Sequence, residues 1–219
     1  MTTNLVFIDS RVADYQTLVA GLSAGSGWVL VDEDRDGLLQ MQAALWDRCD
    51  LTSIRILAHG RPGALMLGAS ELTAETIDRH AQDLAMIGRA LDPEGDVQIY
   101  GCDLGRGQAG RAFVRALTEA IGVPVAAAST PIGHAALGGG WNLDVGDARH
   151  PLLDRPQWYG LLGLTITPLP AASPGRSAGE WRHDCAFAAL RANGSVVTWG
   201  TSGGGSDSSV VATELNGSI

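Results

Sequence analysis

Short apolar runs alternate with amphipathic stretches along the chain from Asn4 to Ala128. Runs rich in Ile, Leu and Val that are bounded by polar residues or Gly are typical of buried parallel strands. This pattern predicts five strands, over residues 4–9, 28–31, 53–58, 96–101 and 124–128. Between them, apolar residues recur with helical spacing over residues 15–22, 38–45, 77–91 and 109–121. Regular alternation of strand and helix predicts an α/β fold, with a mainly parallel sheet covered by helices on both faces.

The pattern changes after Ser129. Residues 130–140 are rich in Gly and small side chains, and residues 141–145 alternate like a short edge strand. Residues 61–68, earlier in the chain, read as a turn and a short strand of a hairpin. Residues 151–164 carry two aromatic side chains and a Leu cluster, which suit a closing helix that packs back on the domain.

We expect three parts in the chain. Residues 1–165 form the α/β domain, and residues 166–180, rich in Pro, Ala, Ser and Gly, are typical of a linker. Residues 181–219 contain an Asn193-Gly194 hairpin turn between two apolar stretches. An isolated hairpin is at best marginally stable, so this part is interpreted as a truncated unit of a β repeat.

Composition excludes several classes of function. The net charge of −9 over 219 residues argues against a nucleic-acid partner. No apolar run approaches the ~20 residues of a membrane span, and the N-terminus lacks the features of a secretory signal. Three cysteines without a CxxC motif indicate neither a disulfide framework nor a zinc site. We expect no cofactor and no metal.

His59 and Cys102 are the candidate catalytic residues. Each ends an apolar strand and lies beside a glycine, Gly60 or Gly101. Ligands bind outside the carboxyl ends of strands in open parallel sheets, so neighbouring strands would bring the two side chains to one edge. A thiolate nucleophile and an imidazole proton donor suit attack on a peptide bond. The backbone N–H groups of Gly60 and Cys102 are candidate oxyanion donors.

Several motifs together resemble a known group of proteins. They comprise Leu5-Val-Phe-Ile-Asp-Ser-Arg-Val12, Asp34-Arg-Asp-Gly37, Ala58-His-Gly60 with Pro62-Gly-Ala-Leu65, Tyr100-Gly-Cys102 and Leu137-Gly-Gly-Gly-Trp141, over roughly residues 4–163. They are similar to the caspase-like cysteine peptidases. The resemblance is closer to a related bacterial domain of unknown function, which occurs at the N-termini of very large surface proteins with cadherin-like or RTX repeats.

The resemblance implies a caspase-like three-layer sandwich with His59 and Cys102 as the catalytic dyad. It implies a cysteine endopeptidase whose substrate is a polypeptide, its own chain included, and a secreted or surface location. Asp103, Gly139 and Trp141 would border the substrate cleft. Asp103 stands where the related domain often has Asn, and its carboxylate would oppose thiolate formation unless it points away to cap the next helix. The tail from about residue 187 resembles a unit of an RCC1 propeller.

Other interpretations compete with the peptidase. The domain could be a non-catalytic N-terminal module of an adhesin that serves assembly or export, and either His59 or Cys102 alone could be structural. A phosphate-binding domain ranks last, because no glycine-rich fingerprint follows the first strand. Residues 175–179 match G-x-S-x-G but lie in the linker, and residues 32–37 match half an EF-hand whose last ligand position holds Ala43. His80 is expected to be structural and His134 to be an exposed loop residue.

Overall fold

The computed structural model describes residues 3–150, 158–163, 186–190 and 196–200. The chain divides into two compact units, Met1–Gly163 and Leu164–Ile219. In the second unit, β10 (Ala186–Leu190) and β11 (Val196–Gly200) form an antiparallel pair. The expected linker over residues 166–180 and the Asn193-Gly194 turn lie outside the described residues.

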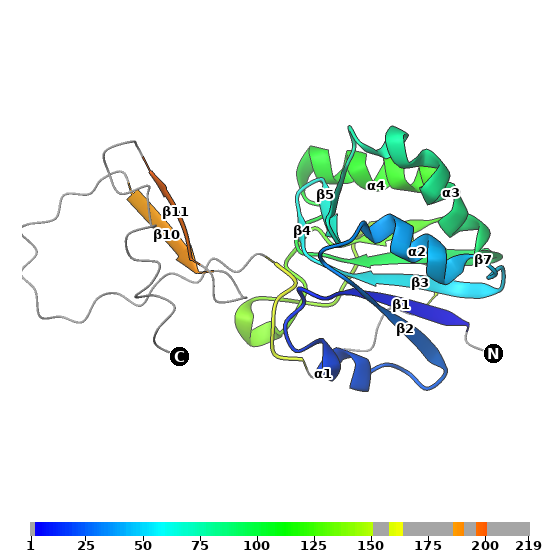
Figure 1. Cartoon of the computed structure of the whole chain (residues 1–219), viewed down its shortest axis with the longest axis horizontal. Coiled ribbons are helices and arrows are strands. Elements are labelled where there is room, and N and C mark those ends of the chain that lie inside the picture. Colours follow the sequence, from blue (N-terminus) through cyan, green and yellow to red (C-terminus); the bar gives the residue numbers. More distant parts are fainter. Residues whose placement is uncertain (1–2, 151–157, 164–185, 191–195, 201–219) are drawn as a thin grey trace, which may run out of the picture. The chain divides into compact units, whose positions relative to one another are not determined.

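The first unit is built on a six-stranded sheet with the order β2-β1-β3-β7-β8-β9 (Figure 1). Its first five strands pair in parallel, and β9 runs antiparallel at the edge beside β8. The strands are β1 (Asn4–Asp9), β2 (Ser26–Val31), β3 (Leu51–Leu57), β7 (Leu91–Tyr100), β8 (Val125–Ala127) and β9 (Val145–Gly146). The prediction of an α/β fold with a mainly parallel sheet is therefore confirmed.

Helices cover both faces of this sheet. Figure 1 shows α2, α3 and α4 on one face and α1 on the other. They are α1 (Tyr15–Ala20), α2 (Gly37–Leu45), α3 (Ala81–Arg89) and α4 (Gly107–Ile121), with 3₁₀ turns η1 (Ile77–His80) and η2 (Ala135–Leu137). The helix expected over residues 77–91 begins as η1, ends at Arg89 and leaves Leu91 to start β7. Among the described residues, no helix combines the length and apolar composition needed to cross a bilayer.

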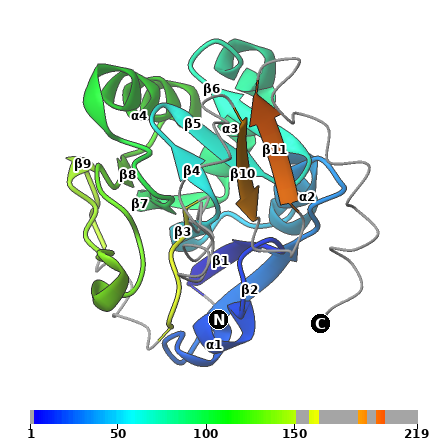
Figure 2. The ribbon, with the colours of Figure 1, turned by 90° about the vertical axis from the view of Figure 1, so that its left-hand side faces the viewer.

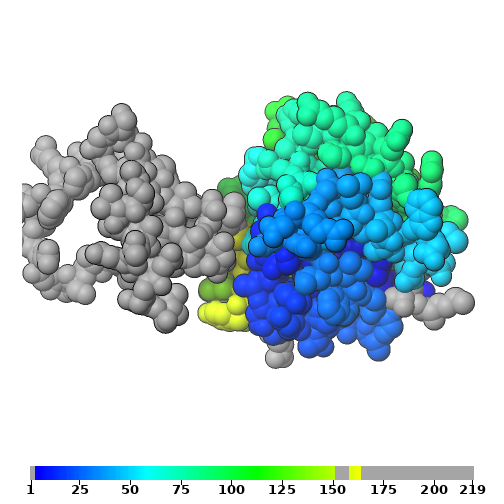
Figure 3. Space-filling model, in the orientation of Figure 1, coloured from blue at the N-terminus to red at the C-terminus, as the bar shows by residue number. Residues whose placement is uncertain are grey.

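Successive side chains of a strand point to opposite faces of the sheet. Because helices cover both faces, the central strands β1, β3 and β7 contribute side chains to two cores. Leu5 and Phe7 of β1 join the core under α2, α3 and α4, whereas Val6 and Ile8 join the core on the α1 side. All four side chains are buried. In the space-filling view, atoms of the N-terminal part of the chain, coloured blue to cyan, cover much of the viewed face of the first unit (Figure 3).

A small three-stranded sheet lies near the carboxyl ends of the central strands. It consists of β4 (Gly60–Arg61), β5 (Ala64–Leu67) and β6 (Ser70–Thr73), paired antiparallel in this order. Its Gly68 turn is fixed to the end of β1, because the Gly68 N–H donates to Asp9 Oδ2 at 2.8 Å and Arg11 Nη2 donates to the Gly68 carbonyl at 2.7 Å. The expected hairpin is thus one part of a larger meander.

The closing helix expected over residues 151–164 is wrong for its described part, residues 158–163. These residues form no helix: Leu161 forms an isolated antiparallel bridge with Gly133, and the chain bends at Leu162 and Gly163. They do pack back on the domain, because the side chains of Trp158 and Leu162 are buried in the α1-side core. Tertiary contacts, and not helical spacing, decide the backbone conformation here.

Candidate functional site

The structure places the ends of β3 and β7 side by side at the centre of the sheet. Leu57 lies level with Tyr100 in the parallel register, and the Ala58 N–H donates to the Tyr100 carbonyl at 3.1 Å. His59 and Cys102 each follow this pair by two residues, so both come to the same edge of the sheet. The expectation that the two apolar strands are neighbours is confirmed.

The two glycines at the strand ends allow close approach of the two strands. A Cβ atom at Gly60 would lie 3.1 Å from the carbonyl oxygen of Cys102, and one at Gly101 would lie 3.4 Å from the carbonyl oxygen of Ala58. In the structure, Gly60 first of all makes room for the other strand of the pair.

His59 is oriented by a backbone carbonyl group. Its side chain is 8 % exposed, and Nε2 lies 3.3 Å from the carbonyl oxygen of Arg11. A carbonyl oxygen only accepts hydrogen bonds, so Nε2 carries the hydrogen in this contact and Nδ1 holds the lone pair in the neutral ring. Nδ1 is buried and has no hydrogen-bond partner. The ring therefore presents one free nitrogen in a nearly closed site.

The Arg11 carbonyl is itself held in place by a buried carboxylate. Asp9 is fully buried, and its Oδ1 accepts from Arg11 Nε at 2.8 Å and from the Arg11 backbone N–H at 3.0 Å. Its Oδ2 accepts from Arg11 Nη2 at 2.8 Å. Bidentate pairs of this kind fix geometry more strictly than single contacts. Asp9 thus positions the group that orients His59.

Cys102 is buried beside the backbone of Ile132. Its Sγ accepts from the Ile132 N–H at 3.1 Å, and its S–H donates to the Ile132 carbonyl at 3.5 Å. The pKa of the Cys102 thiol is raised from 9.0 to about 11; burial is the largest cause, the Ile132 N–H opposes it, and the Asp103 carboxylate adds to the rise. The thiol is therefore neutral at neutral pH, and no hydrogen bond joins it to His59 in the described part of the chain.

An irregular segment, residues 158–163, with a β-bridge at Leu161 and a bend at Leu162 and Gly163, lies beside Cys102; we call it the covering segment. Figure 2 faces the carboxyl ends of the strands and shows this segment in yellow beside them. The Leu162 N–H donates to the Ile132 carbonyl at 2.8 Å, and the His134 N–H donates to the Gly160 carbonyl at 2.9 Å. The Cys102 N–H donates to the Leu162 carbonyl at 3.4 Å.

Both ends of the covering segment are fixed. Trp158 Nε1 donates to the Ala13 carbonyl at 2.8 Å. At the other end, a Cβ atom on Gly163 would lie only 3.2 Å from the Cys102 sulfur. The backbone of Gly163 therefore lies close to the thiol.

Residues 5–156 match the model of the family described as Domain of unknown function (DUF4347). The chain belongs to this family. The match contains both His59 and Cys102, and the covering segment follows it directly. Comparisons with curated proteins and with solved structures gave no significant match.

Asp103, Gly139 and Trp141, the residues expected to border the substrate cleft, have different surroundings in the DUF4347 domain. Asp103 has a left-handed backbone, with φ 56°, and its carboxylate pairs with Arg106 at 3.4 Å. It does not cap α4, whose N-cap residue is Arg106. Gly139 lies against the covering segment, because a Cβ atom there would be 2.7 Å from Leu161 Cδ2. Trp141 is buried and packs on Tyr100 and Trp158, with ring centroids 5.9 and 6.2 Å apart.

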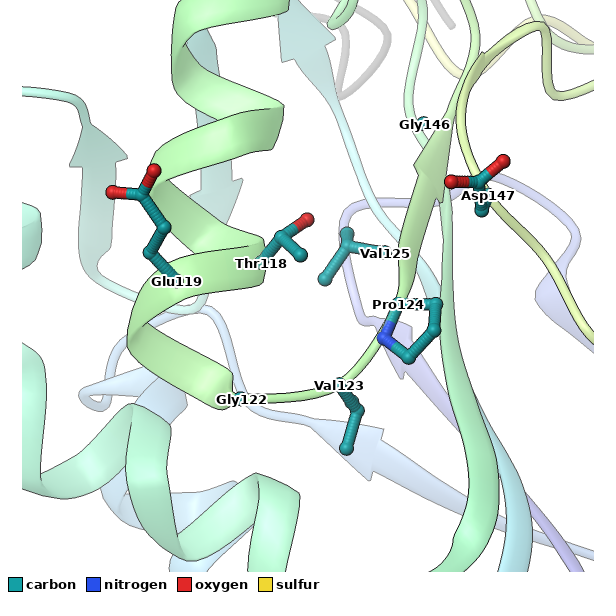
Figure 4. Close-up of a pocket in the computed structure, with 8 residues that line it drawn as sticks. All are labelled: Thr118, Glu119, Gly122, Val123, Pro124, Val125, Gly146 and Asp147. Atoms are coloured by element: carbon teal, nitrogen blue, oxygen red, sulfur yellow. The ribbon is translucent and has the colours of Figure 1, made fainter.

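A shallow hollow of about 380 Å³ lies near the opposite edge of the sheet (Figure 4). It is formed where α4 ends and β8 begins. Val125 of β8 is level with Val97 of β7, five residues before Cys102, so the hollow is separate from the site at Cys102. The residues around it are Thr118, Glu119, Gly122, Val123, Pro124, Val125, Gly146 and Asp147. They include neither a histidine nor a cysteine, so this hollow of the DUF4347 domain offers no thiol and no imidazole.

The other motifs have structural contacts. Asp36 caps α2 by accepting from the Leu39 N–H at 3.0 Å, and it accepts from the Ser70 hydroxyl at 2.8 Å. No group of three or more His, Cys, Asp or Glu side chains is placed to hold a metal in residues 3–150 or the shorter described segments. The Nδ1 atom of His80 lies 3.5 Å from Oδ2 of Asp83. The G-x-S-x-G motif lies outside the described residues.

His134 has a different role from the exposed residue expected from sequence. Its Nδ1 accepts from the Ala136 N–H at 3.2 Å, and its half-buried ring stacks on Tyr159 of the covering segment with centroids 4.6 Å apart. Sequence reasoning also missed the Arg11 carbonyl and the course of the covering segment in this DUF4347 domain. A backbone carbonyl leaves no signature in a side-chain pattern, and the apolar residues 158–162 indicated burial without indicating what they cover.

Proposed function

We propose that the domain is a cysteine endopeptidase of caspase-like type, with Cys102 as nucleophile and His59 as the acid–base group. One observation carries the proposal. The two side chains follow paired residues of neighbouring parallel strands, and His59 is held on the Arg11 carbonyl with Nδ1 left unpartnered in a closed site. A buried imidazole with one free nitrogen, at the same end of the sheet as a thiol, supplies the groups that proton transfer from sulfur requires.

The chemistry assigns a role to each group. The Cys102 sulfur attacks the scissile carbonyl carbon, and His59 Nδ1 takes the thiol proton and passes it to the leaving amine. The backbone N–H groups of Cys102 and Gly60 donate to the oxyanion. The His59 carbonyl accepts from the Met66 N–H, so Gly60 and Leu65 form a non-hydrogen-bonded pair and the Gly60 N–H points away from β5.

The proposed substrate is a polypeptide. The sequence resemblance to domains of giant cadherin-like and RTX-type surface proteins supports a secreted or surface location for the substrate and for the enzyme. The apolar surroundings of Cys102, which include Leu57, Ile132 and Leu162, support an apolar side chain at the cleaved position.

An activity-based probe tests the proposal. A peptidyl acyloxymethyl ketone that ends in Leu should label Cys102, and His59→Ala should abolish the labelling, because the ketone reacts only with an activated thiolate. Cys49→Ala is the matched control, since Cys49 is an exposed free thiol, and this variant should label as the unmodified chain does. Equal labelling of Cys102 with and without His59 would refute the dyad.

A non-catalytic module is the second candidate. It is favoured by the state of the thiol, which is 4 % exposed and whose pKa is raised to about 11. In that case the probe labels Cys102 no faster than a simple alkylating reagent does, and His59→Ala leaves this rate unchanged. The same experiment therefore separates the two candidates.

A further inference from the structure

We infer that the covering segment is the domain's own substrate and that the peptide bond between Leu162 and Gly163 is the bond that Cys102 cleaves. This inference rests on the proposed peptidase function and names its substrate in cis. It accounts for why a candidate nucleophile is buried: the chain that it attacks already occupies the site.

The covering segment has the backbone pairing of a bound peptide. Extended peptides commonly bind by adding a strand, with main-chain hydrogen bonds for affinity and pockets for alternate side chains. Residues 160–162 pair in this way with residues 132–134, through the Leu162 N–H to Ile132 carbonyl bond, the His134 N–H to Gly160 carbonyl bond and the antiparallel bridge between Gly133 and Leu161. The pairing fixes the register of the segment relative to Cys102.

This register places one carbonyl group at the proposed oxyanion donor. The Cys102 N–H donates to the Leu162 carbonyl oxygen at 3.4 Å, and no other backbone carbonyl is its acceptor in the described part of the chain. A Cβ atom on the next residue, Gly163, would be 3.2 Å from Sγ. The carbonyl carbon of Leu162 is bonded to this oxygen and to the Gly163 nitrogen, so the peptide group that contains it has the N–H donor at its oxygen and the nucleophile near its next residue.

The side chain of Leu162 fills an apolar pocket. It is fully buried in the α1-side core, together with Leu57, Tyr100 and Ile132. The residue whose carbonyl is attacked therefore has a specific binding site, which favours Leu over any charged side chain. Trp158 anchors the start of the segment through its hydrogen bond to the Ala13 carbonyl.

The reaction balances with water as the only co-reactant. His59 Nδ1 takes the thiol proton, Sγ forms a bond to the Leu162 carbonyl carbon, and the bond from this carbon to the Gly163 nitrogen breaks. The nitrogen leaves as an amine with the proton from His59. Water then adds to the Cys102–Leu162 thioester, which restores the thiol and leaves a carboxylate on Leu162. The cut falls at the boundary between the two compact units, Met1–Gly163 and Leu164–Ile219, within one residue.

Incubation of the purified 219-residue chain tests the inference, with intact mass and N-terminal sequencing as readouts. We expect fragments 1–162 and 163–219, formed at a rate that does not depend on protein concentration. Cys102→Ala should abolish both fragments, and Cys49→Ala should leave the rate unchanged. Leu162→Met should be cleaved at a similar rate, and Leu162→Asp should be cleaved about a hundredfold more slowly, because its carboxylate enters an apolar pocket.

The outcomes separate this inference from the function on which it rests. Fragments with other termini that disappear in Cys102→Ala would overturn the assigned bond and keep the peptidase. An intact chain whose Cys102 is labelled by the ketone probe in a His59-dependent way would also overturn the assignment of the cleaved bond and would leave the peptidase function standing. An intact chain without such labelling would overturn both. Far-UV circular dichroism of each variant shows whether it is folded, and the Leu162→Met variant keeps the test valid if Leu162→Asp does not fold.

Discussion

The burial of Cys102 predicts a slow reaction with alkylating reagents. Thiolates react and thiols do not, so the rate follows the fraction of ionised sulfur. Burial raises the pKa of this thiol from 9.0 to about 11, which lowers its thiolate fraction at pH 8 by about a hundredfold relative to a thiol that titrates at 9.0. Steric protection by the covering segment lowers the rate further, since the residue is only 4 % exposed.

Leu162→Ala is the perturbation that should reverse this protection. The Leu162 side chain is fully buried in the core cluster that contains Cys102, and truncation of a buried Leu costs about 2–5 kcal/mol of packing free energy. This loss weakens the attachment of the covering segment and admits water to the sulfur. The pKa of Cys102 then falls toward 9.0, and the alkylation rate at pH 8 rises by up to about a hundredfold.

The assay is iodoacetamide labelling at pH 8 in a Cys185→Ser background, followed by mass spectrometry of the uncleaved chain and its peptides. The exposed Cys49 reports the intrinsic reagent rate within each sample. Leu39→Ala is the matched control, because Leu39 is 58 % exposed on α2 and lies outside the site. The reasoning fails if Cys102 reacts as fast as Cys49 in the unmodified chain, or if Leu162→Ala leaves the ratio of the two rates unchanged.

Three further predictions concern the frame of the site. Asp9→Asn should lower the free energy of unfolding in urea by about 2 kcal/mol and reduce kcat more than KM. The reason is that it loosens the partly exposed Arg11, whose carbonyl orients His59. An unchanged kcat would contradict this role. Gly60→Val should cost about 1–3 kcal/mol of stability, measured by thermal unfolding, because its Cβ atom would lie 3.1 Å from the Cys102 carbonyl oxygen. The folded-state pKa of Cys102 lies above 9.0, so the neutral thiol stabilises the fold fully below pH 9 and this contribution of about 3 kcal/mol declines between pH 9 and 11; urea titrations of the unmodified chain should show this decline relative to Cys102→Ala, and parallel pH curves would refute it.

Much of the sheet could be predicted from the sequence because its central strands are buried on both faces. The run from Asn4 to Asp9 is β1 without any change of boundary, and the runs before His59 and Cys102 are β3 and β7. Their neighbourhood followed from βαβ alternation, which has few topological solutions. The two candidate residues of the dyad therefore follow the ends of neighbouring strands.

The covering segment could not be predicted in the same way. Trp158, Leu161 and Leu162 have the spacing of a helical face, but the backbone groups at residues 132–134 offer hydrogen bonds to an extended chain. Gly160 adds to this outcome, because a Cβ atom there would lie 2.4 Å from the Trp158 ring. Contacts between residues about thirty positions apart thus outweighed the local pattern. The sequence pattern likewise carried no sign that Cys102 is covered.

The covering segment also has a consequence for synthesis of the protein. The ribosome makes Cys102 about sixty residues before it makes Leu162, the residue that contributes the carbonyl acceptor for the Cys102 N–H. At roughly 5–20 residues per second, the sulfur of the growing polypeptide stays open to oxidants and to stray acyl donors for several seconds. Premature termination of translation before residue 158 would prolong this exposure for the lifetime of the truncated product.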